Sequence, residues 1–93
     1  MGNINKVLKQ RKKTHGSFTN HSRLSQALKR SYSAYKISDL SDSQQEALDM
    51  ILHKIARIGA GNPNEKDHWV DIGGYAQLIV NEIEQQEKEN KND

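Results

Sequence analysis

Residues 41–63, SDSQQEALDMILHKIARIGAGNP, decide the fold class because they hold a complete helix with a start and a stop signal. Two overlapping pairs, Ser41 with Gln44 and Ser43 with Glu46, have the spacing of a capping box, in which two side chains satisfy free backbone amides of the first turn. Apolar residues then recur every three or four positions, as in a helix that buries one face: Leu48, Ile51, Leu52, Ile55 and Ile58. The run Gly59–Pro63 ends the pattern. A helix is therefore predicted over residues 42–58.

The residues after Pro63 predict another amphipathic helix, over residues 67–86. Asp67 can cap its start, and its apolar stripe has the same spacing: Trp69, Ile72, Ala76, Ile79 and Ile83. The connection between the two helices is short, which favours an antiparallel hairpin. The predicted fold is all-α, a small helical bundle built on this antiparallel hairpin of the two C-terminal helices.

The upstream part of the chain predicts two further helices and no strand. Residues 3–12 can form a short helix, and residues 20–35 a longer one that Thr19 or Asn20 can cap. We divide the chain into three parts, and none is long enough for a second domain. These parts are a basic N-terminal arm or short helix (1–13), a single helical domain (14–86) and a frayed polar tail (87–93).

The composition narrows the class of protein. The chain has no cysteine, which excludes disulfides and thiolate metal sites. No apolar run approaches the ~20 residues of a membrane helix, and the polar N-terminal residues do not resemble a signal peptide. We therefore expect a cytoplasmic protein without a membrane partner. Only 33% of the residues are hydrophobic, so the core of a monomer would be thin. This predicts a homo-oligomer, most simply a two-fold dimer.

The net charge of +2 conceals a strong asymmetry along the chain. Residues 1–38 contain nine Lys or Arg and no acid, whereas residues 39–93 contain twelve acids and five Lys or Arg. Such a division indicates an anionic partner for the N-terminal part, or pairing of the two halves within one chain or between subunits. A nucleic acid is one candidate for the anionic partner, because basic side chains neutralise phosphates.

Cations and carboxylates fall on facing flanks of the predicted hairpin. On helical wheels, Lys54 and Arg57 flank the first stripe, and Asp67, Asp71 and Tyr75 share one flank of the second. One interpretation is a structural ion-pair cluster, whose exposed members contribute ~0–1 kcal/mol each. The other is a binding site in which the cations hold a phosphate and the carboxylates Asp67 and Asp71 hold Mg²⁺.

Two other features point to close approaches. Gly73 and Gly74 lie inside the last predicted helix, where each costs roughly 1 kcal/mol relative to Ala. Either a ligand or another helix approaches the backbone there, and close helix packing, including packing across a dimer, is the favoured reading. His15 precedes Gly16 in a predicted loop, and we expect it to face a ligand beside Lys54, Arg57 and Tyr75.

Four segments together resemble a family of small, all-helical phage and prophage proteins of unknown function. They are Thr14–Phe18, Gln26–Lys29, Lys54–Ile58 and Asp67–Ala76, the last reading DHWVDIGGYA. More distantly, the layout is similar to MazG-type all-α nucleotide pyrophosphatases, which hold Mg²⁺ around a nucleoside triphosphate with helix-borne carboxylates. The chain departs from these patterns at Ser17, where the phage family usually has Asp, and it lacks the complete pair of MazG carboxylate motifs.

Three functions are consistent with these patterns. The resemblance implies a phage-type protein that handles nucleotides, binding or hydrolysing a (deoxy)nucleotide with Mg²⁺ in the cytoplasm of the host cell. The second function is a non-catalytic phage protein that blocks or sequesters a host component. The third is a nucleic-acid binder that uses the basic N-terminus. The patterns leave open whether the protein is an enzyme.

Overall fold

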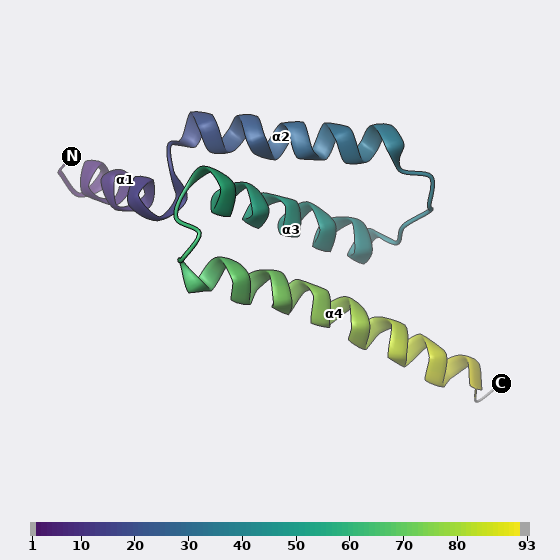
Figure 1. Ribbon diagram of the computed structural model, residues 1–93. Helices are drawn as coiled ribbons and strands as arrows, with labels where there is room; N and C mark the ends of the chain where they lie inside the picture. The colour runs from purple at the N-terminus through teal and green to yellow at the C-terminus, as the bar shows by residue number, and fades with distance from the viewer. Residues whose placement is uncertain (1, 92–93) are drawn as a thin grey trace.

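The computed structural model describes residues 2–91 and consists of four helices (Figure 1). They are α1 (Gly2–His15), α2 (Phe18–Tyr35), α3 (Asp42–Ala60) and α4 (Lys66–Lys91). No strand occurs among these residues. The predicted all-α class is confirmed. None of the described helices combines the length and the apolarity needed to span a membrane.

The observed helix caps match the prediction at the start of α3 and differ from it at the starts of α2 and α4. Ser41 and Gln44 form the predicted capping box, with N–H···O distances of 3.0 and 3.1 Å. Helix α2 starts earlier than expected, because Ser17, rather than Thr19 or Asn20, accepts a hydrogen bond from the first turn. Helix α4 begins at Lys66, so Asp67 lies inside its first turn and is not the cap.

Helix α3 lies between α2 and α4 and packs against both (Figure 1). Helices α3 and α4 run antiparallel, so the predicted hairpin is confirmed. Helices α2 and α4 do not contact each other among the described residues. Helix α1 touches α2 and α3 near the C-terminal end of α3. The described helices α2, α3 and α4 therefore do not close around a common core.

Because α2 and α4 do not contact each other, the described helices enclose little apolar volume. Ala47 and Ala56 of α3 are the buried apolar residues of the described chain, and no large side chain in it is fully buried. The apolar stripe of α3 is only partly covered, and Ile55 is 41% exposed. Polar side chains occupy much of the remaining interior: His21, Ser25, Lys54 and His68. A buried polar group costs free energy unless it forms a hydrogen bond or a charge pair. The partners of these four residues therefore indicate where the interior is specialised.

Candidate anion-binding site

Two connections meet backbone to backbone at the C-terminal end of α3. Gly16, between α1 and α2, has φ +78°, and a Cβ atom there would overlap the carbonyl oxygen of Ala60 at the end of α3. Gly61, after α3, leaves as little room against the backbone of His15 and Gly16. Only glycine combines this backbone angle with so close an approach. The contact fixes His15 and Ser17 beside the C-terminal turn of α3.

A buried histidine ties α4 to the same junction. His68 in the first turns of α4 is only 2% exposed, and its ring lies 4.9 Å from the ring of His15. The junction therefore involves all four helices, although α1 and α4 share no other extended packing.

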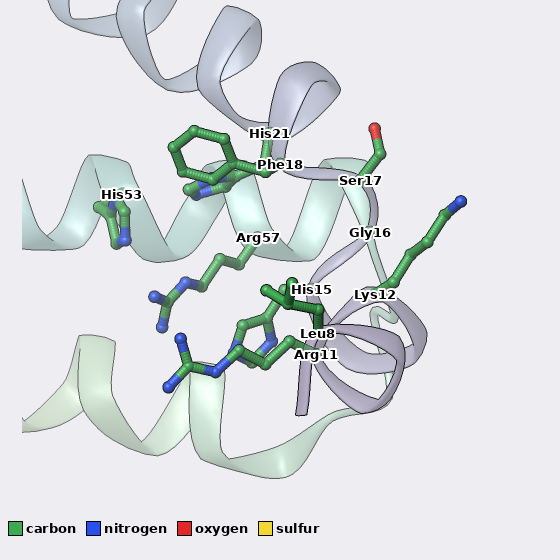
Figure 2. A pocket seen from close by; sticks show the side chains of 10 residues that line it. All are labelled: Leu8, Arg11, Lys12, His15, Gly16, Ser17, Phe18, His21, His53 and Arg57. Carbon is green, nitrogen blue, oxygen red and sulfur yellow. The ribbon is translucent and has the colours of Figure 1, made fainter. Parts of the chain in front are cut away.

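A pocket of about 360 Å³ opens at this junction (Figure 2). Its lining comes from α1, α2, α3 and the connection between α1 and α2: Leu8, Arg11, Lys12, His15, Gly16, Ser17, Phe18, His21, His53 and Arg57. Three of these residues are Lys or Arg, three are His, and none is Asp or Glu. Arg11 and Arg57 extend toward the same side of the pocket in Figure 2. Like charges gathered without a carboxylate create a positive potential that favours anions.

Two imidazoles form the floor of the pocket between α2 and α3. The rings of His21 and His53 lie 4.6 Å apart in an edge-to-face arrangement. Burial lowers the pKa of His21, and burial followed by the charge of Arg57 lowers the pKa of His53 to about 4. Both rings are therefore neutral near pH 7, with one donor and one acceptor nitrogen each. The His21 ring already hydrogen-bonds the backbone of His53, which leaves its Nε2 for a ligand. Perturbed histidines in a concave site are typical of functional positions.

Two polar atoms at the pocket have no hydrogen-bond partner within the described chain. They are Nε2 of His21, a residue that is 6% exposed, and Nε of Arg57. Almost all buried polar atoms in folded proteins are paired, and one left unpaired costs about 1–3 kcal/mol. A ligand with polar atoms that enters the pocket could satisfy both.

The predicted approach of Lys54 to Asp71 is confirmed. Their Nζ and Oδ2 atoms lie 2.8 Å apart, and Lys54 as a residue is 9% exposed. A hydrogen bond and the positive charge of Lys54 lower the pKa of Asp71. This ion pair joins α3 to α4 and compensates the charge of the buried Lys54 ammonium group, so its role is structural.

The other predicted site residues divide into two places. His15 and Arg57 line the pocket, as expected for ligand-binding residues. Asp67 is exposed in the first turn of α4, and Tyr75 borders a shallow depression on α4 together with Asp71. Asp67, Asp71 and Tyr75 do not line the pocket. The six residues thus do not share one groove.

No metal centre is formed by the side chains of the described residues. Among them, no three His, Asp or Glu side chains are placed to hold one ion. Asp67 and Asp71 are one helical turn apart, but Asp71 already pairs with Lys54. Two carboxylates can still suffice for Mg²⁺ when phosphate oxygens and water supply the other ligands.

Sequence patterns did not single out several residues of the pocket. Arg11 and Lys12 were visible only as part of the basic N-terminal charge, and Ser17 only as a departure from the phage family. His21 and His53 are 32 positions apart in the printed sequence, and no spacing rule connects them. Their contact depends on how α2 packs against α3. For these residues, the absence of acids from residues 1–38 was the signal that pointed to an anion site, whereas Arg57 and His15 had been predicted individually.

Comparison with known families places most of the chain in one of them. Residues 3–83 match the model of a family described as Domain of unknown function (DUF6378). The chain belongs to this family. No curated protein and no solved structure matches the chain. The match covers α1, α2, α3 and most of α4, so the pocket lies wholly within the family domain.

Proposed function

We propose that the pocket binds a phosphate-bearing ligand and that the protein handles a (deoxy)nucleotide. The observation that carries the proposal is the lining, which contains three Lys or Arg and three His without a single carboxylate. Its volume of about 360 Å³ lies within the range of small-molecule sites, about 300–1,000 Å³. The resemblance of the sequence to phage proteins and to MazG-type pyrophosphatases supports the same ligand class.

The side chains of the pocket suit the parts of a nucleotide. Arg57 and Arg11 can bind phosphate oxygens through charge-assisted hydrogen bonds, and guanidinium groups match phosphate geometry in a bidentate manner. Phe18 lies at the pocket with 82% of its surface exposed, so its ring is open to a stacking base. His21 and His53 add neutral donors and acceptors for the sugar or the base.

Magnesium would accompany the phosphates. Mg²⁺ commonly takes one or two protein carboxylates, with substrate phosphates and water completing the octahedron. Asp67 and Asp71 on α4 are the candidates, and because they lie outside the pocket lining, the phosphates would have to extend from the pocket toward α4 to reach such a metal ion. Asp71 would then exchange Lys54 for the metal. Mg²⁺ bound with the phosphates would neutralise charge there, as hydrolysis of a phosphoanhydride requires.

Calorimetric titration of the protein with nucleoside triphosphates, deoxynucleoside triphosphates and inorganic pyrophosphate, with and without Mg²⁺, tests the proposal. We expect Arg57→Gln to weaken binding about tenfold or more, because the lost contact is to a charged group. Arg23→Gln removes the same charge from an exposed site on α2 outside the pocket and serves as the matched control. Equal loss in both variants, or no binding by the unmodified protein, would refute a nucleotide site.

The same titrations distinguish the nucleic-acid alternative, which one observation favours. Lys6 and Lys9 are exposed on α1 and do not line the pocket. A nucleic acid that tracks α1 would lose affinity in the Lys6→Gln/Lys9→Gln variant and would show a steep dependence on salt. A nucleotide in the pocket would bind that variant almost as well as the unmodified protein.

A further inference from the structure

A second apolar stripe runs along α4 on a side that α3 does not cover. It consists of Trp69, Gly73, Ala76, Val80 and Ile83, which we name the α4 seam. The steps between these residues alternate between four and three, the spacing of a coiled-coil seam. All five are exposed, with Trp69 at 55%, Val80 at 44% and Ile83 at 41%. Three apolar side chains of this size in one exposed row indicate a surface that another element covers.

The glycine of the α4 seam is not explained by packing within the chain. A Cβ atom built on Gly73 would meet no atom within 4 Å. Gly in a helix interior costs roughly 1 kcal/mol relative to Ala, and no close contact inside the molecule offsets that cost. A small residue in a helical seam allows a second helix to approach the backbone closely. The open space beside Gly73 could hold such a helix.

The α4 seam continues onto α3. Ala76 of the seam lines a shallow depression of about 340 Å³ together with Leu48 and Ile51 of α3 and Ile79 of α4. The same apolar stripe of α3 leaves Ile55 exposed. One face of the α3–α4 hairpin is therefore apolar and uncovered. Stable domains pack such a face against another element, and none of the helices within residues 2–91 covers it, because α2 packs against α3 and does not contact α4.

We propose that the α4 seam is the interface of a two-fold homodimer in which α4 of one copy packs antiparallel against α4 of a second copy. Contacts across a two-fold axis are reciprocal, so one patch serves both subunits. The two α3–α4 hairpins then form a four-helix arrangement whose centre is the uncovered apolar face. A second copy is the occupant that the charges of the chain favour.

Charge complementarity selects the second copy and its direction. The C-terminal half of α4 carries an excess of acid: Glu82, Glu84, Glu87 and Glu89 against Lys88 and Lys91. A parallel pair would bring these acids together. An antiparallel pair carries them to the opposite end of the partner. The first turns of α4 there hold Lys66 against Asp67 and Asp71, so the complementary charge comes from the five Lys or Arg of α1, which lies at the same end (Figure 1). Opposite charges on facing flanks set the orientation of paired helices.

Sedimentation equilibrium of the full chain tests the dimer. We expect a mass of twice 10.6 kDa at tens of micromolar. Val80→Glu places a charge in the α4 seam and should halve the mass while circular dichroism shows the helices retained. Asn81→Glu adds the same charge one residue away, outside the seam, and should leave the dimer intact. A monomeric unmodified protein would overturn the proposal, as would equal dissociation in the two variants.

Crosslinking tests the direction, and the chain suits it because it contains no cysteine. Lys66→Cys and Glu87→Cys mark the two ends of α4. With a short bis-maleimide reagent, we expect a mixture of the two variants to form crosslinked dimers and each variant alone to form few. Efficient crosslinking of either variant with itself would show a parallel pair and overturn the antiparallel arrangement.

Discussion

The glycines of the junction and the glycines of α4 differ in what surrounds them. Gly16 and Gly61 lie where the α1–α2 and α3–α4 connections touch, and an added Cβ would collide with backbone atoms at each. Gly73 and Gly74 lie in the middle of a regular helix with open space around them. At the junction, contacts within one chain explain why glycine is needed. In the middle of α4, no contact within the described chain explains Gly73 and Gly74. A second surface packed against α4 would explain them.

This contrast separates two roles of one residue type. At the junction, glycine allows a backbone approach that positions the cationic pocket. On α4, the same residue weakens the helix without a compensating contact in the chain. A ligand site and an association surface are the corresponding proposals, and they occupy different ends and faces of the α3–α4 hairpin. Each can therefore be disrupted without the other.

The largest effect is expected at Gly16. Gly16→Ala forces a side chain into a left-handed conformation, at ~1–2 kcal/mol, and drives its Cβ into the carbonyl of Ala60. Together these should lower the free energy of unfolding by about 3 kcal/mol. Urea denaturation followed by circular dichroism measures the loss. Gly74→Ala adds the same methyl group on the open part of α4 and should leave stability unchanged or slightly higher.

If Gly16→Ala proved as stable as Gly74→Ala, the close packing of the two connections would be wrong. The pocket would then lack its positioning element, since His15 and Ser17 flank Gly16 in the chain. Nucleotide affinity should fall with stability in Gly16→Ala and should be unaffected in Gly74→Ala, which gives a second reading of the same comparison.

The sequence predicted the features that depend on local residue spacing and missed those that depend on how the helices pack. Helix α3 and its Ser41–Gln44 capping box depend on local spacing and were predicted correctly. The Lys54–Asp71 pair followed from wheel positions on two helices with a short connection. The His21–His53 contact depends on the packing of α2 against α3, which no periodicity encodes. The cap at Ser17 was missed because Thr19 and Asn20 are equally good capping residues nearby.

The exposed seam of α4 was also hidden in the sequence. Trp69, Ala76 and Ile83 fit a single predicted stripe with Ile72 and Ile79. The structure divides that stripe, because Ile72 and Ile79 are partly buried while the other three are exposed. The reason is that α4 packs against α3 alone among the described helices, so that only one side of α4 is covered.

An intermediate effect is expected at the link between the two regions. Asp71→Asn leaves the buried ammonium of Lys54 without a carboxylate, so the melting temperature should fall. Lys54→Met removes the charge and keeps the length of the side chain, and the double variant should recover part of the loss. If Asp71 instead holds Mg²⁺ for a nucleotide, Asp71→Asn would abolish Mg²⁺-dependent binding while the melting temperature stayed nearly constant.

The same pair predicts a dependence on acid. The pKa of Asp71 is lowered in the folded protein, so the unfolded chain binds the proton more readily. The contribution of the pair is therefore complete above the ordinary value of 3.8 and is lost as the pH falls through the lowered pKa. In Asp71→Asn, the fall in stability below that pH should be shallower than in the unmodified protein.

A smaller effect is expected from the histidines of the pocket. The pKa of His53 is lowered from 6.5 to about 4 by burial and by Arg57, so the unfolded chain binds a proton between these values and the folded protein does not. Stability should be complete above pH 6.5, decline as the pH falls toward 4, and level off below. Since much of the ring is open to solvent, the loss should be on the order of 1 kcal/mol. His53→Gln should flatten the profile in this window.

An anionic ligand should oppose this decline. A bound phosphate next to His53 favours the imidazolium form and raises its pKa. The affinity of the pocket for inorganic pyrophosphate should therefore rise between pH 8 and pH 6, and His53→Gln should weaken that rise. Because pyrophosphate also takes up a proton over this interval, the two proteins are compared by calorimetry, and the same pH dependence in His53→Gln as in the unmodified protein would contradict an anion site at His53.

The smallest effect, and the one most specific to the comparison, is expected at Gly73. In an isolated subunit, Gly73→Ala should raise the free energy of unfolding by about 0.5–1 kcal/mol, because Ala favours the helix and the added methyl meets nothing. The Val80→Glu background, in which the dimer is expected to be absent, isolates this gain. In the unmodified background, the methyl group enters the α4 seam and should increase the dissociation constant of the dimer. At low protein concentration, where the subunit is isolated, Gly73→Ala should raise the free energy of unfolding. At high concentration it should lower it, because dimer formation adds to stability in proportion to the logarithm of concentration. A gain that is the same at every concentration would show that no second helix approaches Gly73.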